Sequence, residues 1–140
     1  MTSYDKDNIF AQILDGKIPS VKIFENDHCI AIMDPFPQSK GHALVVPKAA
    51  SRHLLDADPA LLALVIQDVQ KLGIASKAAF NADGIRIMQF NEAPAGQTIF
   101  HLHIHVLPAY EGVEMGAHGK GMADMEELEQ QAALIRAQLA

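Results

Sequence analysis

The sequence predicts one α+β domain with a mainly antiparallel sheet of about five strands, a long central helix, a short N-terminal helix and a C-terminal helix. Several short segments have the alternating or continuous apolar pattern of strands, and one longer segment has apolar residues at helical spacing. Links of hairpin length join most of the expected strands, which favours antiparallel pairing. Residues 1–140 therefore form a single domain, with a core at about 8–108 and a tail with its helix at 109–140.

Composition and charge exclude several classes of protein. The formal net charge of −6 argues against a broad nucleic-acid-binding surface. No apolar run approaches the roughly 18 residues that a membrane span needs, and the polar first residues lack the pattern of a signal peptide. Cys29 is the only cysteine, so we expect no internal disulfide and a small core residue at this position. A cytoplasmic protein with neither nucleic acid nor membrane as its partner is expected.

The N-terminal part of the chain predicts a short helix followed by two strands. The helix is expected at residues 8–14, capped by Asp7 and ended by Gly16. Strands are expected at residues 22–25 and 28–33, because a turn-forming segment separates two apolar runs. A segment with two prolines then breaks the pattern and indicates a loop.

The middle of the chain predicts a strand, a long helix and another strand. Residues 41–47 are mostly apolar, so this strand is expected to be buried on both faces. Asp58 followed by Pro59 is a strong helix start, and the helical spacing continues to about Phe80. Residues 85–90 alternate and predict a fourth strand.

The last part of the chain predicts a fifth strand, an irregular segment and a helix. The strand is expected at residues 100–108, antiparallel to the fourth strand. Residues 109–123 contain several glycines, and His118 within them is expected to be exposed to solvent. Residues 124–139 predict an amphipathic helix capped by Asp124.

Three histidines alternate with apolar residues in the fifth strand. His101, His103 and His105 should share one face, about 6.5–7 Å apart along the strand. A solvated edge strand explains this poorly, because such faces usually carry other polar residues. Two chemical interpretations remain: a metal site formed by the imidazoles, or phosphoryl transfer with a histidine nucleophile.

The residues upstream of the histidines favour phosphoryl transfer. Asn91, Gln97 and Thr98 offer neutral hydrogen-bonding groups, and Gly96 offers flexible backbone close to them. Such groups suit phosphate oxygens and are poor zinc ligands. Among nearby carboxylates only Glu92 is available to complete a metal site.

The same segments resemble a known family. Residues 101–107 match the His-φ-His-φ-His-φ-φ pattern of the histidine triad (HIT) family of nucleotide hydrolases and transferases. The resemblance extends over about residues 8–108. Further segments similar to the family are Gly-Gln-Thr at 96–98, Asn-Glu at 91–92, Gly-His-Ala-Leu-Val-Val-Pro-Lys at 41–48, and Ile-Phe at 9–10 with Ile-Pro at 18–19.

The resemblance implies a role for each matched catalytic position. His103 corresponds to the nucleophile that takes the nucleoside monophosphate, His105 to a residue that contacts the phosphate, and His101 to one that supports the nucleophile's orientation. Gln97 and Thr98 correspond to residues near the scissile bond, where a hydroxyl group can help to protonate the leaving group.

The resemblance also implies a nucleotide site. Asn91 corresponds to a phosphate contact, and Asp34 to the acidic residue that holds the ribose hydroxyls as a bidentate acceptor. His53 resembles a fourth histidine of the family, although two extra residues precede it here. The positions that match the lining of the base pocket are Ile9, Phe10, Ile13 and Ile32.

The implied activity is cleavage of the α-phosphate linkage of purine nucleoside 5′-phosphate derivatives through a covalent nucleotidyl-histidine. Such substrates include AMP or GMP phosphoramidates, adenylates and dinucleoside polyphosphates. The resemblance implies a homodimer and no cofactor. Many bacterial relatives carry a zinc-binding Cys-x-x-Cys, but Asn8 and Ala11 occupy those positions here, so no metal is expected. A nucleotide-binding module with little turnover, and a metal-dependent hydrolase that uses the histidine cluster, stay open as alternatives.

Simpler explanations stand beside several of these assignments. Asp34 precedes a proline and can cap a turn. The apolar positions of the first helix can be ordinary core. His28 and His42 are expected to be a surface histidine and a packed strand histidine, both outside the site.

Overall fold

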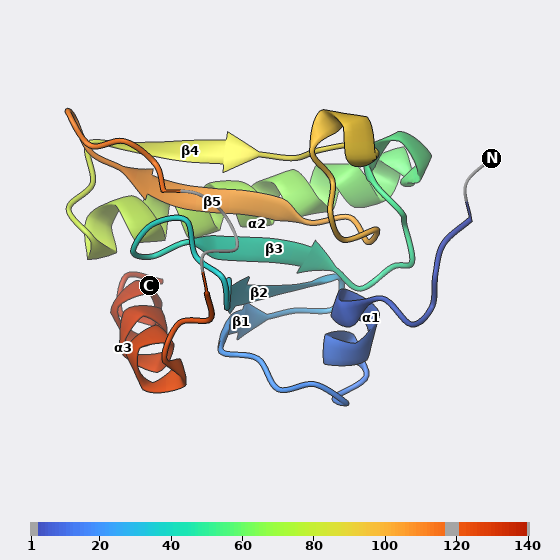
Figure 1. Cartoon of the computed structure of the whole chain (residues 1–140), viewed down its shortest axis with the longest axis horizontal. Helices are drawn as coiled ribbons and strands as arrows, with labels where there is room; N and C mark the ends of the chain where they lie inside the picture. The colour runs from blue at the N-terminus through green and yellow to red at the C-terminus, as the bar shows by residue number, and fades with distance from the viewer. Residues whose placement is uncertain (1–2, 117–120, 140) are drawn as a thin grey trace.

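Short apolar segments of the chain form one antiparallel sheet in the computed structural model, which describes residues 3–116 and 121–139. The strands lie in the order β1-β2-β3-β5-β4, and every neighbouring pair is antiparallel (Figure 1). The predicted five-stranded α+β fold is therefore confirmed, while the expectation for His118 lies outside the described residues. The strands are β1 (Lys22–Glu25), β2 (Cys29–Met33), β3 (Ala43–Pro47), β4 (Gly84–Met88) and β5 (Ile104–Ala109).

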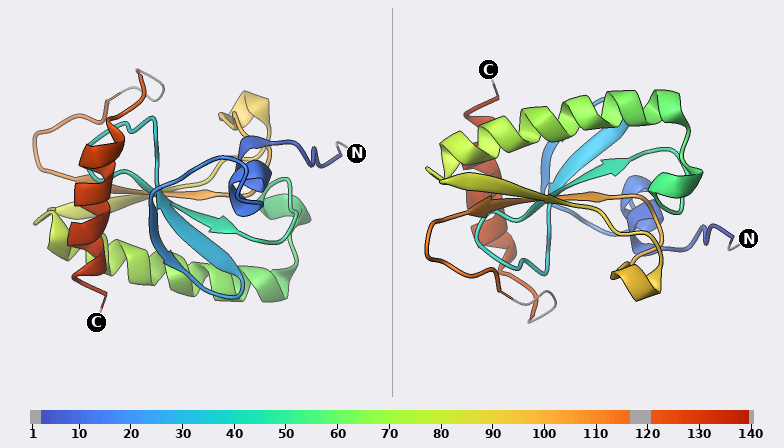
Figure 2. Two further views of the ribbon diagram at one scale, coloured as in Figure 1. Left: turned by 90° about the horizontal axis from the view of Figure 1, so that it is seen from below. Right: turned by 90° about the horizontal axis from the view of Figure 1, so that it is seen from above.

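Helices lie on both sides of the sheet (Figure 2). The long helix α2 (Pro59–Ala79) and the C-terminal helix α3 (Met125–Arg136) pack on one face, and the short helix α1 (Ile9–Leu14) packs on the other. Two 3₁₀ turns lie in the connections: η1 (Leu54–Asp56) between β3 and α2, and η2 (Ala93–Ala95) between β4 and β5. No helix among residues 3–116 and 121–139 is both long and apolar enough to cross a membrane.

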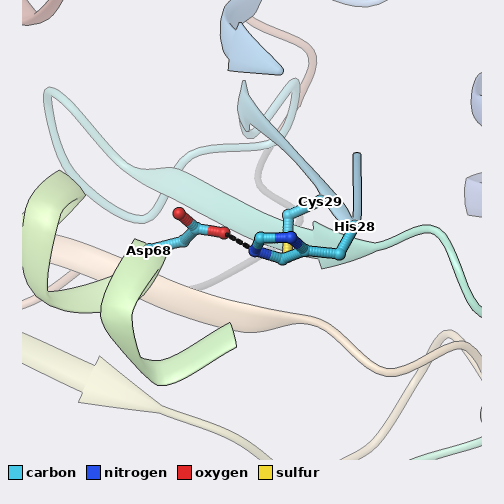
Figure 3. Close-up of side chains that lie close together, drawn as sticks. All are labelled: His28, Cys29 and Asp68. Carbon is cyan, nitrogen blue, oxygen red and sulfur yellow. Dashed lines mark ion pairs between the residues drawn. The ribbon is translucent and has the colours of Figure 1, made fainter. Parts of the chain in front are cut away.

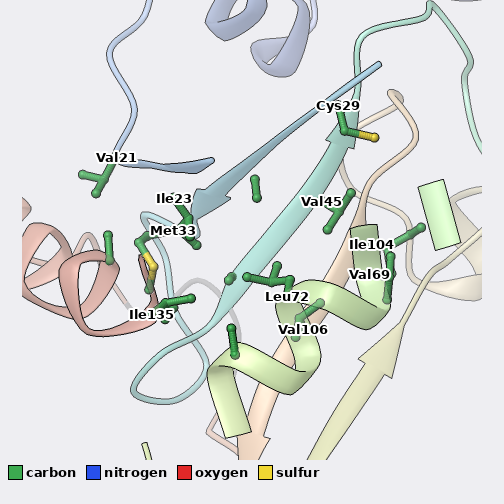
Figure 4. Close-up of a cluster of buried hydrophobic side chains, with 14 of the residues drawn as sticks. Val21, Ile23, Cys29, Met33, Val45, Val69, Leu72, Ile104, Val106 and Ile135 are labelled. Atoms are coloured by element: carbon green, nitrogen blue, oxygen red, sulfur yellow. The ribbon is translucent and has the colours of Figure 1, made fainter. Parts of the chain in front are cut away.

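Strand alternation divides the buried side chains into two clusters. The larger cluster joins α2 and α3 to side chains such as Ile104 and Val106 of β5 (Figure 4). The smaller cluster packs Phe10 of α1 against Leu44 of β3 and its neighbours. Because successive side chains of a strand point to opposite faces, His105 faces the α1 side, where its register partner is Leu44.

The start of α2 follows the sequence expectation, whereas the start of α1 differs in detail. The Asp58 side chain accepts a hydrogen bond from the backbone N–H of Ala60, so Asp58 is the N-cap of α2 as predicted. At α1 the N-cap is Asn8, whose side chain accepts from Ala11 N–H, and the prediction of Asp7 as the cap was wrong. Asn8 is an equally good capping residue that lies one position closer to the helix.

The strand predicted at residues 100–108 begins later than expected, at Ile104. The backbone N–H of Leu102 donates to the carbonyl of Ser51, at 2.9 Å, instead of to a strand of the sheet. His101 and His103 therefore lie in the segment before β5, and only His105 belongs to the strand itself.

The C-terminal tail is bonded to the loop between β2 and β3. Gly116 N–H donates to the carbonyl of Gln38 at 3.0 Å, and Gln38 Nε2 donates back to the carbonyl of Gly116 at 3.3 Å. Further along, Ala123 N–H donates to the carbonyl of Pro35 at 2.9 Å. The loop at 34–41 is thus held from both sides, by the sheet and by the tail.

Candidate active site

The three histidines of the fifth predicted strand gather on the α1 side of the sheet and are buried. The rings of His103 and His105 lie with their centroids 5.0 Å apart, closer than the spacing of a regular strand predicts. The Phe10 ring of α1 packs 4.7 Å from His103 and 6.2 Å from His101. The prediction that the three imidazoles share one side therefore agrees with the structure.

A backbone carbonyl assigns the proton of His103. Nδ1 of His103 lies 2.7 Å from the carbonyl oxygen of His101. A carbonyl oxygen can only accept, so Nδ1 carries the proton and donates it to this bond. In the neutral ring the lone pair is then on Nε2, the nitrogen that a nucleophilic role requires.

His101 is bonded at both ring nitrogens and holds this segment in place. Its Nε2 donates to the carbonyl of Pro47 at 2.7 Å, and Nδ1 accepts from the Tyr4 hydroxyl at 2.6 Å. Burial lowers the pKa of His101 below its ordinary value, which keeps the ring neutral. His101 thus acts on His103 through its own carbonyl group.

His42 is a member of the site that the sequence analysis missed. Its Nδ1 accepts from Gln38 N–H at 3.0 Å, so the ring proton is on Nε2. That Nε2 lies 2.9 Å from Nδ1 of His105 and 3.3 Å from a carboxylate oxygen of Asp34. With Nδ1 of His105 as the acceptor, a neutral His105 carries its proton on Nε2 and is a hydrogen-bond donor there.

Asp34 caps a turn and also lies beside the histidines, while its expected contact with the ribose hydroxyls stays a prediction. One carboxylate oxygen accepts from Phe36 N–H at 2.8 Å, which is the expected turn cap. The other faces His42, and the Asp34 side chain also lines a cavity with His103 and His105. The carboxylate is buried, so its polar partners are needed to hold it there.

Two cavities lie against the histidine pair, and a third adjoins the smaller of them. A cavity of about 310 Å³ lies beside His103 and His105, and its wall includes Thr98 and Phe90. A smaller one of about 50 Å³ also touches both histidines and is lined by Ile9, Phe10, Ile13 and Asp34. Its lining residues Ile9, Ile13, Pro35 and Phe36 also line an apolar cavity of about 390 Å³, which Ile32, Met122 and Met125 help to enclose.

Gln97 stabilises the loop before the histidines. Its Oε1 accepts from Glu92 N–H at 2.7 Å, and its Nε2 donates to the carbonyls of Arg52 and Ile99 at 2.8 and 3.0 Å. Gln97 and the adjacent Thr98 line the cavity of about 310 Å³. Their expected place near the scissile bond stays a prediction.

Asn91 and His53 do not line any of the three cavities described above. Asn91 Oδ1 accepts from Leu54 N–H at 3.0 Å. His53 Nε2 lies 2.8 Å from Glu92, whose carboxylate also pairs with Arg52 at 2.8 Å. The Arg52 guanidinium, with a smaller effect of His53, lowers the pKa of Glu92 to about 2. The nucleotide contacts expected of Asn91 and His53 stay predictions.

Two groups of side chains among the described residues place three potential metal ligands within 4.8 Å of one another. Asp34, His42 and His105 form the first, inside the site, where the hydrogen bonds given above already join them. The second group lies across the sheet and includes His28, whose Nε2 lies at ion-pair distance, 2.7 Å, from Asp68, so His28 is not simply a surface residue as expected.

Comparison with known proteins places these features in a family. The model of the HIT domain matches residues 15–112. An adenylylsulfatase of Arabidopsis thaliana is 34% identical over 110 residues, which are 79% of this chain but only 56% of that protein.

Two solved structures have the same fold. A Hit-like protein from Bartonella henselae, solved with an unknown ligand, is 50% identical with a TM-score of 0.92, and the match covers 98% of this chain and 100% of that one. A HIT family hydrolase from Clostridium thermocellum is 28% identical with a TM-score of 0.65, over 79% of this chain and 96% of that one.

Proposed function

Because this chain belongs to the HIT family, we propose that it is a nucleotide hydrolase or nucleotidyl transferase that works through a covalent histidine intermediate. The observation that carries the proposal is the bond from His103 Nδ1 to the carbonyl of His101, at 2.7 Å. It directs the lone pair of a neutral ring to Nε2, beside a cavity that can receive a phosphate group. The similarity to an adenylylsulfatase and to a HIT family hydrolase supports hydrolysis of this general kind.

In the first step Nε2 of His103 attacks the α-phosphorus, and the bond from phosphorus to the leaving group breaks. The leaving group takes a proton, for which the Thr98 hydroxyl at the cavity wall is the candidate donor. The positive charge that develops on the ring is stabilised by the Nδ1–H bond to the carbonyl of His101. Water then attacks phosphorus and returns a proton to the Thr98 oxygen, the nitrogen–phosphorus bond breaks, and the nucleoside monophosphate leaves.

His105 donates a hydrogen bond to the phosphate in this scheme. Its Nδ1 accepts from His42, so its Nε2–H can donate to a phosphate oxygen. A neutral donor of fixed direction stabilises the charge on the oxygens without rearranging during the reaction. No resident cofactor takes part in the proposed steps.

The cavities suggest how the substrate lies. The apolar cavity beside Ile9 and Ile13 suits a purine base, and Asp34 between that cavity and the histidines suits the ribose hydroxyls. The cavity of about 310 Å³ on the other side of the histidines suits the leaving group. An AMP or GMP derivative with a phosphorus–nitrogen or phosphoanhydride bond is the proposed substrate.

The test is a single-turnover reaction with a panel of adenosine phosphoramidate, aminoacyl adenylate and diadenosine polyphosphate, followed by mass measurement of the denatured protein. We expect a nucleotidyl adduct on wild-type protein, no adduct on His103→Ala, and slower formation on His105→Ala, which keeps the nucleophile. Bound nucleotide without an adduct would favour a binding module. Turnover that stops when a chelator is added would favour a metal-dependent hydrolase.

We propose further that the protein is a homodimer formed through α2 and β4. β4 is an edge strand of the sheet, and α2 beside it exposes Ile66 and Ile74, which are 58% and 67% accessible. Together with Ile87 of β4 they line an apolar depression of about 360 Å³. A second copy would cover this surface and supply a partner for the edge strand.

A further inference from the structure

A second cluster of chemically reactive side chains lies on the α2 side of the sheet, opposite the histidine pair (Figure 3). Cys29 is the first residue of β2 and points into the core below α2. Asp68 lies on the buried side of α2, and His28 precedes β2. The function proposed above uses none of these side chains.

The geometry of the cluster is compact. Nε2 of His28 lies 2.7 Å from a carboxylate oxygen of Asp68. One ring nitrogen of His28, a carboxylate oxygen of Asp68 and the Cys29 sulfur all lie within 4.8 Å of one another. Cys29 is fully buried and Asp68 is 7% exposed, while a quarter of the His28 side chain reaches the surface. The cluster is therefore closed by the core on one side and open to water on the other.

Asn26 fixes the three side chains from behind. Its Nδ2 donates to both carboxylate oxygens of Asp68, at 3.1 Å each. Its Oδ1 accepts from the backbone N–H groups of His28 and Cys29, at 3.0 and 2.9 Å. One amide thus orients the backbone of two residues and the carboxylate of the third, as groups behind metal ligands do.

The Asp68 carboxylate lies beside the apolar core, where an ionised group needs polar or charged partners. Its partners include the Asn26 amide and the His28 ring. A divalent cation bound to the carboxylate and to a thiolate makes the cluster neutral, and the thiol proton leaves to solvent.

We propose that His28, Cys29 and Asp68 bind a divalent cation of the zinc type, with water as the fourth ligand on the exposed side. Nitrogen, sulfur and carboxylate oxygen are the ligands that Zn²⁺ takes, usually in a tetrahedron. Bond lengths of about 2.0–2.3 Å place tetrahedral ligand atoms roughly 3.3–3.8 Å apart. The contact from His28 to Asp68 has to lengthen to reach this range, a movement that the partly exposed His28 ring can make.

Cobalt titration of untagged full-length protein tests the site. Cys29 is the only cysteine, so a thiolate-to-cobalt charge-transfer band in the near ultraviolet can arise only from this cluster. We expect the band to saturate at one Co²⁺ per chain and to disappear when Zn²⁺ is added. Cys29→Ser should abolish the band, and Asp68→Asn should weaken binding at least tenfold.

His105→Gln is the matched control, because cobalt held by Asp34, His42 and His105 has no sulfur ligand and gives no such band. We expect this variant to keep the band of the wild type. A wild-type protein without the band at millimolar cobalt would overturn the proposal and leave a hydrogen-bonded cluster alone, whether or not the variants fold. Equal zinc content in wild type and Cys29→Ser after dialysis would also overturn it.

Discussion

Backbone groups assign the ring protons of His103 and His42, and His42 in turn assigns that of His105. The carbonyl of His101 directs the proton of His103 to Nδ1, and the N–H of Gln38 directs the proton of His42 to Nε2. His42 in turn makes Nδ1 of His105 an acceptor. Backbone groups do not titrate, so this pattern of donors and acceptors is present before the substrate arrives.

His42→Ala should lower kcat by at least about tenfold, as the loss of an orienting partner usually does. The reason is that His105 loses the donor that determines its tautomer, while the walls of the proposed nucleotide cavities stay, so KM should change less. His42→Gln restores an N–H donor and should recover part of the rate. Steady-state kinetics with circular dichroism of the fold check this, and a His42→Ala enzyme with wild-type kcat would contradict it.

Sequence alone draws attention to His101, His103 and His105 but not to His42. His101, His103 and His105 are conspicuous because three imidazoles alternate with apolar residues. His42 stands alone at the start of an apolar strand, where packing is the simpler explanation. Its role depends on the register that pairs Leu44 with His105, since residues two apart in a strand share a face. The spacing of two residues between His42 and Leu44 could indicate this role only with the pairing of Leu44 and His105 already known.

At the scale of elements, the segment before β5 shows where periodicity is insufficient. Alternation predicts a strand from residue 100, yet the chain pairs with the sheet only from Ile104. The preceding segment is bonded to Ser51 and, through the His101 ring, to Pro47. Alternation predicts on which face of an extended segment each side chain lies. The strand or loop with which that segment forms hydrogen bonds depends instead on residues far away in the sequence. The helices are predicted better, because caps such as Asp58 are local signals.

Gly41 lies just before β3 and packs against Phe80 at the end of α2, and its replacement tests this close contact. It has φ +85°, and a Cβ there would lie 2.6 Å from the Phe80 ring and 3.0 Å from Pro108. We expect Gly41→Ala to lower the free energy of unfolding by about 2–4 kcal/mol, from backbone strain and overpacking together.

Gly112→Ala is the matched control for this substitution. Gly112 has φ +77° but no neighbour within 4 Å, so only backbone strain of about 1 kcal/mol is expected. Urea denaturation of the two variants and the wild type measures both effects. Equal losses in the two variants would show that contact with the Phe80 ring adds nothing.

Glu92 links η2 to the segment before η1 through its ion pairs with Arg52 and His53. The stabilisation that these pairs give depends on pH. Arg52 first, and His53 second, lower the pKa of Glu92 to about 2, from 4.5 in the unfolded chain. The folded protein thus binds this proton less readily, so the stabilisation is complete above pH 4.5 and is lost as the pH falls toward 2.

Glu92→Gln should therefore be less stable than wild type at neutral pH, and the difference should shrink as the pH falls from about 4.5 to 2. Urea denaturation across this range measures the trend. A difference between the two proteins that stays constant with pH would show that the charge of Glu92 does not contribute, and that the variant loses stability for another reason.

At the scale of the whole molecule, the surface formed by α2 and β4 predicts the assembly. Ile66→Glu combined with Ile74→Glu places charges in the apolar depression beside the edge strand. We expect this double variant to sediment as a monomer where the wild type sediments as a dimer. Leu55→Glu is the control, because Leu55 is 71% exposed and lies outside that depression. Identical sedimentation of wild type and double variant would contradict the proposed interface.

The tail is attached to the loop at 34–41, and this attachment affects how the two segments can change in sequence among homologues. Gln38 carries the N–H that directs His42 and is also bonded to Gly116, so the C-terminal segment and the histidine cluster share one support. A Cβ at Gly116 would lie 2.4 Å from the Gln38 carbonyl, so the two segments fit only as a pair. In chimeras between homologues, transplanting the tail alone should lower activity through the loss of this shared support, and co-transplanting the loop should restore it.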